Sequence, residues 1–408
     1  MPLSYMMSSL NMNEFIPYGK QDISASDIQA VTDVLQSSHL TQGEVVPAFE
    51  SSIAEVVDSR FAIATNSATS ALHITCLGLG LGPGDVLWTS PISFVASANC
   101  GLYCGAEVDF VDVNPKTGRL CPNRLREKLQ KAANLPKIVI PVHLGGNPCE
   151  MRAIRELGDQ YGFKIIEDAS HAIGATYETQ PVGNCQFSDA VIFSFHPVKI
   201  ITCGEGGVIT TNDKNLAHRL EMLRSHGITK EVGKLLNPGE GGWYYEQQLL
   251  GLNYRLTDIH AALGLSQLKR LNGFIERRRE LVKEYNIRLA HSPAGLPDDK
   301  ELDTSAWHLY PIRLKSNSTC SRKQLYDHLQ EKNIGVNVHY IPIYRQPFFA
   351  KLNFNPSSFP GAESYYESTL SLPLHPGLSQ WQMERISREV CKKLRPDETD
   401  SKYHKTTD

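Results

Sequence analysis

The sequence has 408 residues, of which 41% are hydrophobic and 21% are charged. This length accommodates two or three domains, or one large α/β domain with a smaller appendage. The formal net charge of -3 provides no basic field for nucleic acid, and no RNA-binding signature is present. No run approaches the roughly 18 apolar residues that a membrane-spanning helix needs. We therefore expect a globular protein with no nucleic-acid or membrane partner.

The cysteines indicate a reducing compartment. There are nine of them, scattered along the chain, and no two have CxxC spacing. Cys100 and Cys104 are the nearest pair, but a zinc site would need two more ligands, so we expect no metal. This usage is typical of reduced, mostly buried thiols, and the first residues lack the basic and apolar regions of a signal peptide. The sequence predicts a cytoplasmic protein.

Helical and strand-like segments alternate through the first half of the chain. Residues 24–38 carry an apolar stripe at helical spacing, with Ser24 or Ser26 as the candidate N-cap. Short apolar runs predict buried strands, and helical patterns such as 122–133 and 150–161 separate most of them. The predicted strands are residues 61–65, 85–90, 106–113, 137–143, 163–168 and 190–195. This alternation predicts an α/β fold with a mostly parallel sheet covered on both faces.

Longer helices and a smaller domain follow. Residues 215–227 and 257–290 are predicted to be helical, the second with Thr257 as its N-cap. The intervening residues 227–256 are rich in glycine and aromatic residues, and loops of this length are usually functional or disordered. The pattern then becomes that of an α+β unit. The predicted parts are an N-terminal extension (1–15), a large cofactor-binding domain (16–270), a connector helix (271–299), a small C-terminal domain (300–394) and a polar tail (395–408).

Three predicted strands end in groups that could build one site. One strand ends at Asp168, with His171 three residues later, and the segment "FSFHPVK" brings Ser194, His196 and Lys199 after another strand. The first strand runs through "TNSATS" into a helix. Because sites in open α/β sheets form at the carboxyl ends of strands, we expect these groups to meet. A helix start preceded by small residues binds anions, since free N–H groups and the helix dipole converge there.

Pyridoxal phosphate requires this combination of groups. A lysine forms a Schiff base with the cofactor, a carboxylate keeps the pyridine nitrogen protonated, and a helix N-terminus holds the phosphate. Phe94 follows a predicted strand, where it could cover the ring. Each residue alone has a simpler explanation: Lys199 as a surface charge, Asp168 as an N-cap or ion-pair residue, His171 and His196 as structural histidines, and Phe94 as core. The order and spacing of the whole set favour the cofactor hypothesis.

Longer motifs resemble a known enzyme family. The segments "NSATSAL", "TSPISFVASANCGLYCGAEVDFVD", "IIEDASHAIGA", "SFHPVKIITCGEGG" and "GLNYRLTDIHAALGLSQL" are similar, in this order, to the DegT/DnrJ/EryC1/StrS sugar aminotransferases. The resemblance extends from about Ile16 to about Leu394, nearly the whole chain. It implies a fold-type I, pyridoxal-phosphate-dependent aminotransferase with a large, mostly parallel sheet domain and a smaller C-terminal α+β domain.

The resemblance implies roles for individual residues. Lys199 matches the lysine of the Schiff base, and Asp168 matches the carboxylate that faces the pyridine nitrogen. His171 matches the position near the ring hydroxyl, and Phe94 matches the aromatic side chain that stacks on the ring. Asn253 matches an asparagine that reaches the phosphate bound by the neighbouring protomer, which implies a homodimer with shared active sites. The remaining phosphate ligands are Thr69, Ser70 and Ser194.

Other segments are similar to the branch of this family that makes the 4-amino sugar of pseudaminic acid, a component of bacterial surface glycans. They include "LTQGEVVPAFE", "IPVHLGGNPCEM", "WYYEQQLLGLNYRLTDI" and "GVNVHYIPIY". This branch implies amino transfer from L-glutamate to C4 of a UDP-4-keto-6-deoxy-N-acetylhexosamine. The sugar-binding positions implied are Tyr18, Thr41, His339 and Tyr340, and for the last two a domain-packing strand is an equal alternative.

Three other functions remain open. In sugar 3-dehydratases of this family a histidine replaces the Schiff-base lysine, and the presence of Lys199 argues against that reaction. Another nucleotide-linked 4-keto sugar, of the bacillosamine or lipopolysaccharide type, is harder to separate, because the C4 configuration depends on which sugar face meets the cofactor. A non-catalytic, aminotransferase-like protein is the third. Arg255 is the best candidate to bind the donor carboxylate, with an ion pair that steadies its loop as the alternative.

Overall fold

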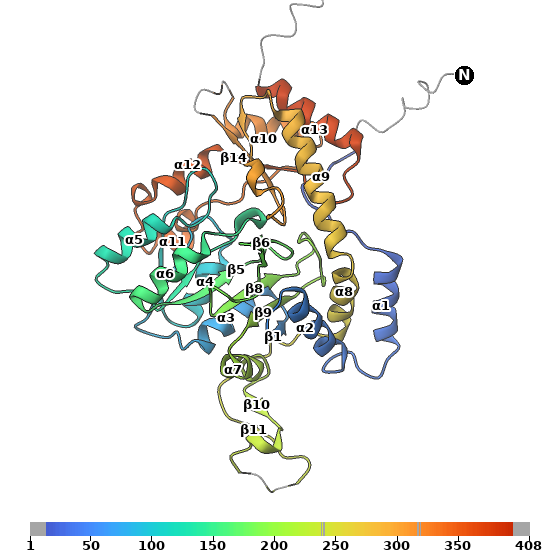
Figure 1. Ribbon diagram of the computed structural model, residues 1–408, viewed down its shortest axis with the longest axis vertical. Coiled ribbons are helices and arrows are strands. Elements are labelled where there is room, and N and C mark those ends of the chain that lie inside the picture. Colours follow the sequence, from blue (N-terminus) through green and yellow to red (C-terminus); the bar gives the residue numbers. More distant parts are fainter. Residues whose placement is uncertain (1–13, 238, 240, 316–317, 319, 395–408) are drawn as a thin grey trace, which may run out of the picture.

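The computed structural model describes residues 14–394 except 238, 240, 316, 317 and 319. Almost all of the predicted N-terminal extension and the whole predicted tail therefore lie outside the described residues. A seven-stranded sheet with the strand order β1-β9-β8-β5-β4-β2-β3 forms the centre, and helices surround it (Figure 1). The predicted α/β class is confirmed.

The central sheet is mixed but mostly parallel. Four neighbouring pairs, from β3 through β2, β4 and β5 to β8, are parallel, whereas β9 runs antiparallel to both β1 and β8. The strand β9 is missing from the predicted strands, because its five residues directly follow a glycine-rich turn and only two of them are apolar. The strands are β1 (Phe61–Thr65), β2 (Val86–Thr89), β3 (Glu107–Phe110), β4 (Ile138–Ile140), β5 (Lys164–Asp168), β8 (Ala190–Ser194) and β9 (Gly207–Thr211).

Alternate side chains of each strand enter different cores on the two faces of the sheet. In β8, Ile192 packs with residues of α3 and α7, whereas Val191 and Phe193 pack with residues of α2 and α8. Because helices cover both faces of the sheet, a binding site is expected at the ends of the strands. The helices of this part are α1 (Ala25–Leu35), α2 (Val45–Val56), α3 (Ala68–Gly78), α4 (Ala96–Tyr103), α5 (Pro122–Lys131), α6 (Met151–Tyr161), α7 (Lys214–Arg224) and α8 (Asp258–Leu268).

The helix predicted over residues 257–290 is in fact two helices, α8 and α9 (Leu271–Leu289). The break falls at Lys269 and Arg270, and the apolar pattern conceals it because Leu268 and Leu271 keep helical spacing across it. Thr257 is the N-cap of α8, as the sequence predicts, and of the two candidates for α1 the N-cap is Ser24 and not Ser26. The long helix α9 then carries the chain from the central sheet to the C-terminal part (Figure 1).

The C-terminal part contains an antiparallel sheet with the order β12-β13-β14. Its core also includes Ile16, whose N–H donates to Asn333 O at 2.9 Å. Conversely, Phe349 and Tyr365 join a core of the central sheet, so the chain crosses between the two parts more than once. The division at residue 300 stays a prediction. The elements are β12 (Ala294–Gly295), β13 (Tyr310–Leu314), α10 (Arg322–Glu331), α11 (Pro347–Ala350), α12 (Pro360–Ser368), β14 (Thr369–Leu372) and α13 (Gln380–Leu394).

Two short hairpins lie outside these sheets. One pairs β6 (Thr176–Tyr177) with β7 (Gln180–Pro181). The other pairs β10 (Ile228–Thr229) with β11 (Glu246–Gln247) and projects from the body of the molecule below α7 in Figure 1. We call residues 228–250 the arm. The arm covers most of residues 227–256, the segment that is rich in glycine and aromatic residues.

Arg278 is a buried cation that ties α9 to the C-terminal part. It is 2% exposed and donates to Trp307 O at 3.1 Å and to Leu374 O at 3.0 Å. Burial lowers the pKa of its guanidinium to about 10. We expect Arg278→Met to lower the free energy of unfolding by about 2–4 kcal/mol, because buried carbonyl oxygens lose their charged donor while the volume stays filled.

Urea denaturation measures this effect. Lys283→Met is the matched control, because Lys283 is an exposed cation on the same helix. The control should change the free energy of unfolding by no more than about 0.5 kcal/mol. Equal changes in the two variants would show that Arg278 contributes nothing through its buried contacts.

Candidate active site

The predicted groups meet at the carboxyl ends of β5 and β8, around a cavity of about 460 Å³. Asp168 ends β5, Ser194 ends β8, and the turn after β8 brings Lys199 to the same space. The residues singled out in the sequence that line this cavity are Tyr18, Thr69, Phe94, Asp168, His171, Ser194, His196, Lys199, His339 and Tyr340. Six segments that are separate in the sequence thus form one site.

Lys199 has the environment of a reactive amine. Its backbone N–H donates to His196 O at 2.9 Å, and within the described chain its ammonium has no hydrogen-bond or ion-pair partner. Burial lowers the pKa of Lys199 to about 8, although the Asp168 carboxylate acts in the opposite direction. A neutral amine is the nucleophilic form, so the cavity makes Lys199 reactive near physiological pH.

Asp168 is 5% exposed and is held by hydroxyl groups. The Ser170 hydroxyl donates to Oδ1 at 2.6 Å, and the Ser97 hydroxyl donates to Oδ2 at 2.6 Å. Neither serine was singled out in the sequence, although Ser170 lies only two residues after the aspartate. These contacts fix the carboxylate at the edge of the cavity.

Three buried histidines stand near Lys199. His171 and His308 have ring centroids 4.4 Å apart, and His308 was not predicted. Burial and the nearby Lys199 hold the pKa values of His171 and His308 well below their usual range, and they lower the pKa of His339 to about 3. Near pH 7 all three rings are therefore neutral. The lysine and acidic side chains that line the cavity are Lys199, Asp168 and Glu205.

The hydrogen bonds of His171 define its tautomer. The Gly145 N–H donates to Nδ1 of His171 at 3.2 Å, so the proton of the neutral ring is on Nε2. That nitrogen lies 3.2 Å from the Tyr340 hydroxyl, which accepts its proton. The hydroxyl proton of Tyr340 is then free to be donated to a ligand in the cavity. His339 and Tyr340 lie outside the strands of the structure and line the cavity, which does not support the alternative of a domain-packing strand.

The start of α3 faces the same cavity and can bind an anion. Ser67 is the N-cap and accepts from Ser70 N at 3.1 Å, whereas the N–H groups of Ala68 and Thr69 have no acceptor within the described chain. Thr69 lines the cavity, but Ser70 does not, since its hydroxyl donates to Asn66 Oδ1 at 2.5 Å. The capping pattern in the sequence could have identified Ser67.

Gly207 allows β9 to pass close to this helix start. A Cβ atom at Gly207 would lie 2.5 Å from the backbone nitrogen of Ala68 and from the carbonyl of Ser67. Only glycine avoids that collision. In the sequence, the glycine-rich turn suggests that the chain leaves room for a cofactor. In the structure, the group that lies close to Gly207 is the start of α3, which can bind an anion.

Phe94 lies on the wall of the cavity and not in the core. Its side chain is 60% exposed, which is unusual for a large aromatic residue beside a buried carboxylate. Across the site, the ring of Tyr18 lies 5.6 Å from that of His339. Exposed aromatic faces of this kind are suited to a flat ligand ring.

Three further residues singled out in the sequence do not reach the cavity within one chain: Thr41, Asn253 and Arg255. Thr41 is exposed beside a loop that Asp258 holds through Gly43 N at 2.7 Å. Asn253 is exposed and forms an isolated antiparallel bridge with Ser225. Cavity residues that the sequence did not single out include Ser67, Ser93, Val142, Ser170, Val198, Glu205 and Asn337.

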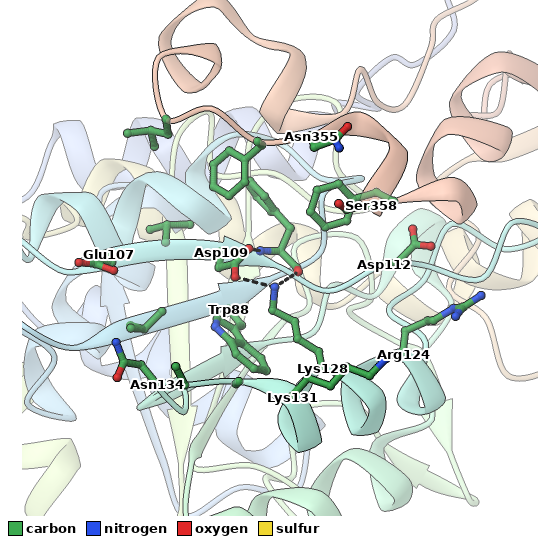
Figure 2. A pocket seen from close by; sticks show the side chains of 18 of the residues that line it. Trp88, Glu107, Asp109, Asp112, Arg124, Lys128, Lys131, Asn134, Asn355 and Ser358 are labelled. Carbon is green, nitrogen blue, oxygen red and sulfur yellow. Dashed lines mark hydrogen bonds and ion pairs between the residues drawn. The ribbon is translucent and has the colours of Figure 1, made fainter.

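A larger groove of about 1160 Å³ lies elsewhere, along the outer edge of β3 (Figure 2). There Lys128 of α5 donates to Asp109 Oδ2 at 2.5 Å and to Phe110 O at 2.9 Å, and its ammonium lies over the ring of Trp88. These contacts occupy the open edge of the sheet, which protects it from pairing with another strand. Lys128 in this groove is paired with Asp109, whereas Lys199 has no such partner among the described residues. We therefore place the active site at Lys199.

The nine cysteines are all free thiols, and Cys100 and Cys104 are both buried. In the part of the chain that the structure describes, no group of three or more His, Cys, Asp or Glu side chains is arranged to hold a metal ion. No helix among these same residues is long and apolar enough to cross a membrane.

Fold and site together define a class of enzyme, the pyridoxal-phosphate-dependent aminotransferases of fold type I. The cavity fits the cofactor, because it combines a partner-free lysine, a buried carboxylate, an exposed aromatic ring and free N–H groups at a helix start. A comparison with family profiles matches residues 21–391 to the DegT/DnrJ/EryC1/StrS aminotransferase family. The chain belongs to this family, and it is a pyridoxal-phosphate-dependent nucleotide-sugar aminotransferase.

Similar proteins span nearly the whole chain. The spore coat polysaccharide biosynthesis protein SpsC of Bacillus subtilis is 36% identical over 93% of this chain and 97% of its own length. A UDP-4-amino-4,6-dideoxy-N-acetyl-β-L-altrosamine transaminase of Campylobacter jejuni is 39% identical over 88% of this chain and 92% of its own length. The solved structure of Helicobacter pylori PseC, an aminotransferase of pseudaminic acid biosynthesis, superposes with a TM-score of 0.85 at 32% identity, covering 93% and 99% of the two chains.

The lowered pKa of Lys199 predicts how cofactor capture depends on pH. We expect the cofactor-free enzyme to take up pyridoxal phosphate faster as the pH rises, with a half-point near about 8, because the neutral amine attacks. A lysine at its ordinary pKa would place the half-point near 10.5. Stopped-flow absorbance at fixed cofactor concentration measures the rate. A half-point above about 10 would contradict the role given to the cavity.

Proposed function

We propose that this enzyme transfers the amino group of L-glutamate to C4 of UDP-2-acetamido-2,6-dideoxy-β-L-arabino-hex-4-ulose, a step in pseudaminic acid synthesis. The observation that carries the proposal is the shared cavity of Lys199 and Asp168, with His339 and Tyr340 on its wall. The Campylobacter and Helicobacter relatives support the choice of sugar, since their names assign them to this reaction or pathway. We place the reaction in the cytoplasm, in keeping with the nine free thiols.

Lys199 and Asp168 carry the chemistry in this proposal. Pyridoxal phosphate supplies an electron sink when bound. Lys199 would hold the cofactor covalently, and its neutral amine would move the proton to and from the reacting carbon. Asp168 would hold the proton on the ring nitrogen of the bound cofactor, because a buried carboxylate stabilises a cation beside it. Thr69 and Ser194 bind the phosphate at the start of α3 together with the free N–H groups there.

The other wall of the cavity binds the nucleotide sugar. Tyr18 offers a half-buried ring, His339 a neutral imidazole, and Tyr340 a hydroxyl that donates its proton. A keto sugar presents hydroxyl and carbonyl oxygens, which accept such hydrogen bonds. His171 takes the position beside the cofactor's ring hydroxyl. Thr41 is the remaining sugar contact, and it requires the neighbouring subunit or a movement of its loop.

The test is a panel of UDP-linked 4-keto-6-deoxy-N-acetylhexosamines with L-glutamate as donor. Mass spectrometry reports amination, and NMR assigns the configuration at C4 of each product. We expect turnover to be fastest with the β-L-arabino ketone. Faster turnover of a D-configured ketone would assign the enzyme to a bacillosamine- or lipopolysaccharide-type pathway instead, and no amination of any ketone would overturn the proposed activity.

We further propose a homodimer with shared active sites. Asn253 does not line the cavity of its own chain, although its side chain is exposed and free to enter another. The arm beside it exposes Val232, Leu236, Trp243 and Leu250, each at least 75% accessible. An apolar surface of this kind on a projecting hairpin is typical of a subunit interface. In the dimer, Asn253 would bind the cofactor phosphate of the partner subunit.

Mixing two inactive variants tests the shared site. Lys199→Ala and Asn253→Ala homodimers should each lose activity, whereas a mixed dimer has one site in which both residues are native. Refolding the two variants together should restore about a quarter of wild-type activity, because half of the dimers are mixed and half of their sites are intact. The absence of recovery, despite mixed dimers seen by native mass spectrometry, would place Asn253 in its own chain's site.

A further inference from the structure

The carboxylate of Asp168 has more partners than its role as a cofactor contact requires. Its Oδ1 atom accepts both from the backbone N–H of Ser170 at 3.2 Å and from the Ser170 hydroxyl at 2.6 Å. Its Oδ2 atom accepts from the Ser97 hydroxyl at 2.6 Å. A carboxylate has about four acceptor positions, two on each oxygen. Only one position, on Oδ2, is therefore left for a ligand.

The direction of the hydrogen bonds behind Asp168 follows from simple counting. Ser97 lies 2.7 Å from the hydroxyl of Ser93, and either oxygen could in principle donate. A carboxylate can only accept, so the single proton of the Ser97 hydroxyl goes to Asp168. Ser97 must then accept from Ser93. The chain runs from Ser93 through Ser97 to Oδ2 of Asp168, and it is buried throughout.

The same short segment also carries the ring at the mouth of the site. Ser97 lies in the first turn of α4, Ser93 lies four residues before it and ahead of the helix, and Phe94 lies between them. Ser97 is 0% exposed and does not line the cavity, so it cannot touch a ligand itself. It connects the residue that covers the cofactor's face to the carboxylate at the cofactor's edge.

We propose that Ser97 is a positioning residue, which directs the one free acceptor position of Asp168 towards the ring nitrogen of the cofactor. This inference rests on the proposed function of Lys199 and Asp168. Hydroxyl donation to Oδ2 would stop the carboxylate from rotating and keep its remaining lone pair directed into the cavity. The ring nitrogen then keeps its proton, on which the electron sink depends.

The test reads that proton directly. Apoenzyme is reconstituted with pyridoxal phosphate labelled with ¹⁵N in the ring, and the nitrogen chemical shift is followed by NMR from about pH 6 to about pH 9. The wild type should show the protonated nitrogen throughout. Ser97→Ala should lose a large part of that signal within this range, and its kcat should fall about 10- to 100-fold, whereas KM for the sugar changes little.

Ser90→Ala is the matched control. Ser90 is also 0% exposed, but it hydrogen-bonds only within its own loop, to the backbone of Ile92. Removing either buried hydroxyl should lower the thermal midpoint, and only the Ser97 change should move the nitrogen signal. Ser97→Cys keeps the shape with a weaker donor and should give an intermediate shift.

The two proposals fail differently in this experiment. A wild type that neither binds the cofactor at Lys199 nor aminates a ketone would remove the proposed function. An active wild type together with an unchanged nitrogen signal and unchanged kcat in Ser97→Ala would overturn the role of Ser97 alone. Equal shifts in Ser97→Ala and Ser90→Ala would also overturn it, because a general loosening of the fold would then explain both.

Discussion

Replacing Lys199 with alanine is expected to lower amino transfer by about 10⁴-fold, the largest effect of any single substitution in this chain. The amine is the only group in the cavity that can both hold the cofactor covalently and move a proton at the reacting carbon. Burial lowers its pKa to about 8, which makes it available for both tasks. Turnover with L-glutamate and the β-L-arabino ketone, followed by mass spectrometry, measures the loss.

The unfolding temperature of the Lys199→Ala variant distinguishes a loss of catalysis from a loss of folding. Lys199 is a partly desolvated cation without a partner among the described residues, so its charged form makes the folded state less stable below about pH 8. That cost is fully present at pH 7 and is removed as the pH rises from the folded pKa of about 8 to the ordinary value of 10.5. The apo form of Lys199→Ala should therefore unfold at a temperature no lower than wild-type apoenzyme. Lys323→Ala, an exposed lysine on α10, should leave turnover unchanged, and a similar loss there would contradict the assignment.

Asp168→Asn is expected to lower kcat by about 10³-fold while Lys199 still binds the cofactor. The amide keeps the shape of the carboxylate but cannot balance a charge on the ring nitrogen. The amide nitrogen of the asparagine would also replace a carboxylate oxygen that accepts from the Ser97 or Ser170 hydroxyl. An amide nitrogen cannot accept, so that hydrogen bond would be lost or reversed.

Absorbance of the bound cofactor and steady-state kinetics check this prediction together. Retention of the bound-cofactor spectrum with a large loss of kcat is the expected pattern. Asp189→Asn is a suitable control, because that carboxylate pairs with Lys164 at the other end of β5 and β8. Near-wild-type turnover in Asp168→Asn would mean that the ring nitrogen lies elsewhere.

The parts of the fold that depend on local pattern are predictable from the sequence. The N-caps Ser24 and Thr257 and the strands that end in Asp168 and Ser194 were all found, because capping and buried apolar runs leave short-range signals. The strand at residues 207–211 was missed because it is identified only by its neighbours β1 and β8. The break between α8 and α9 was missed because the apolar spacing continues across it.

The candidate site divides in the same way. Asp168 ends a strand and Lys199 and Phe94 each lie in the loop after one, so their positions in the sequence already place them together. Ser97 and His308 were not predicted, since their contacts with Asp168 and His171 join elements 71 and 137 residues apart in the sequence. Asn253 cannot be placed by one chain, because its predicted ligand belongs to another subunit.

Covalent attachment of the cofactor to Lys199 is the central claim, and peptide mapping tests it most directly. The purified enzyme is incubated with pyridoxal phosphate, reduced with borohydride to fix the bond, digested, and analysed by mass spectrometry. We predict that the cofactor is attached at Lys199 and that the Lys199→Ala variant carries none. Attachment at a different lysine in the wild type, or no attachment at all, would contradict the active site described above.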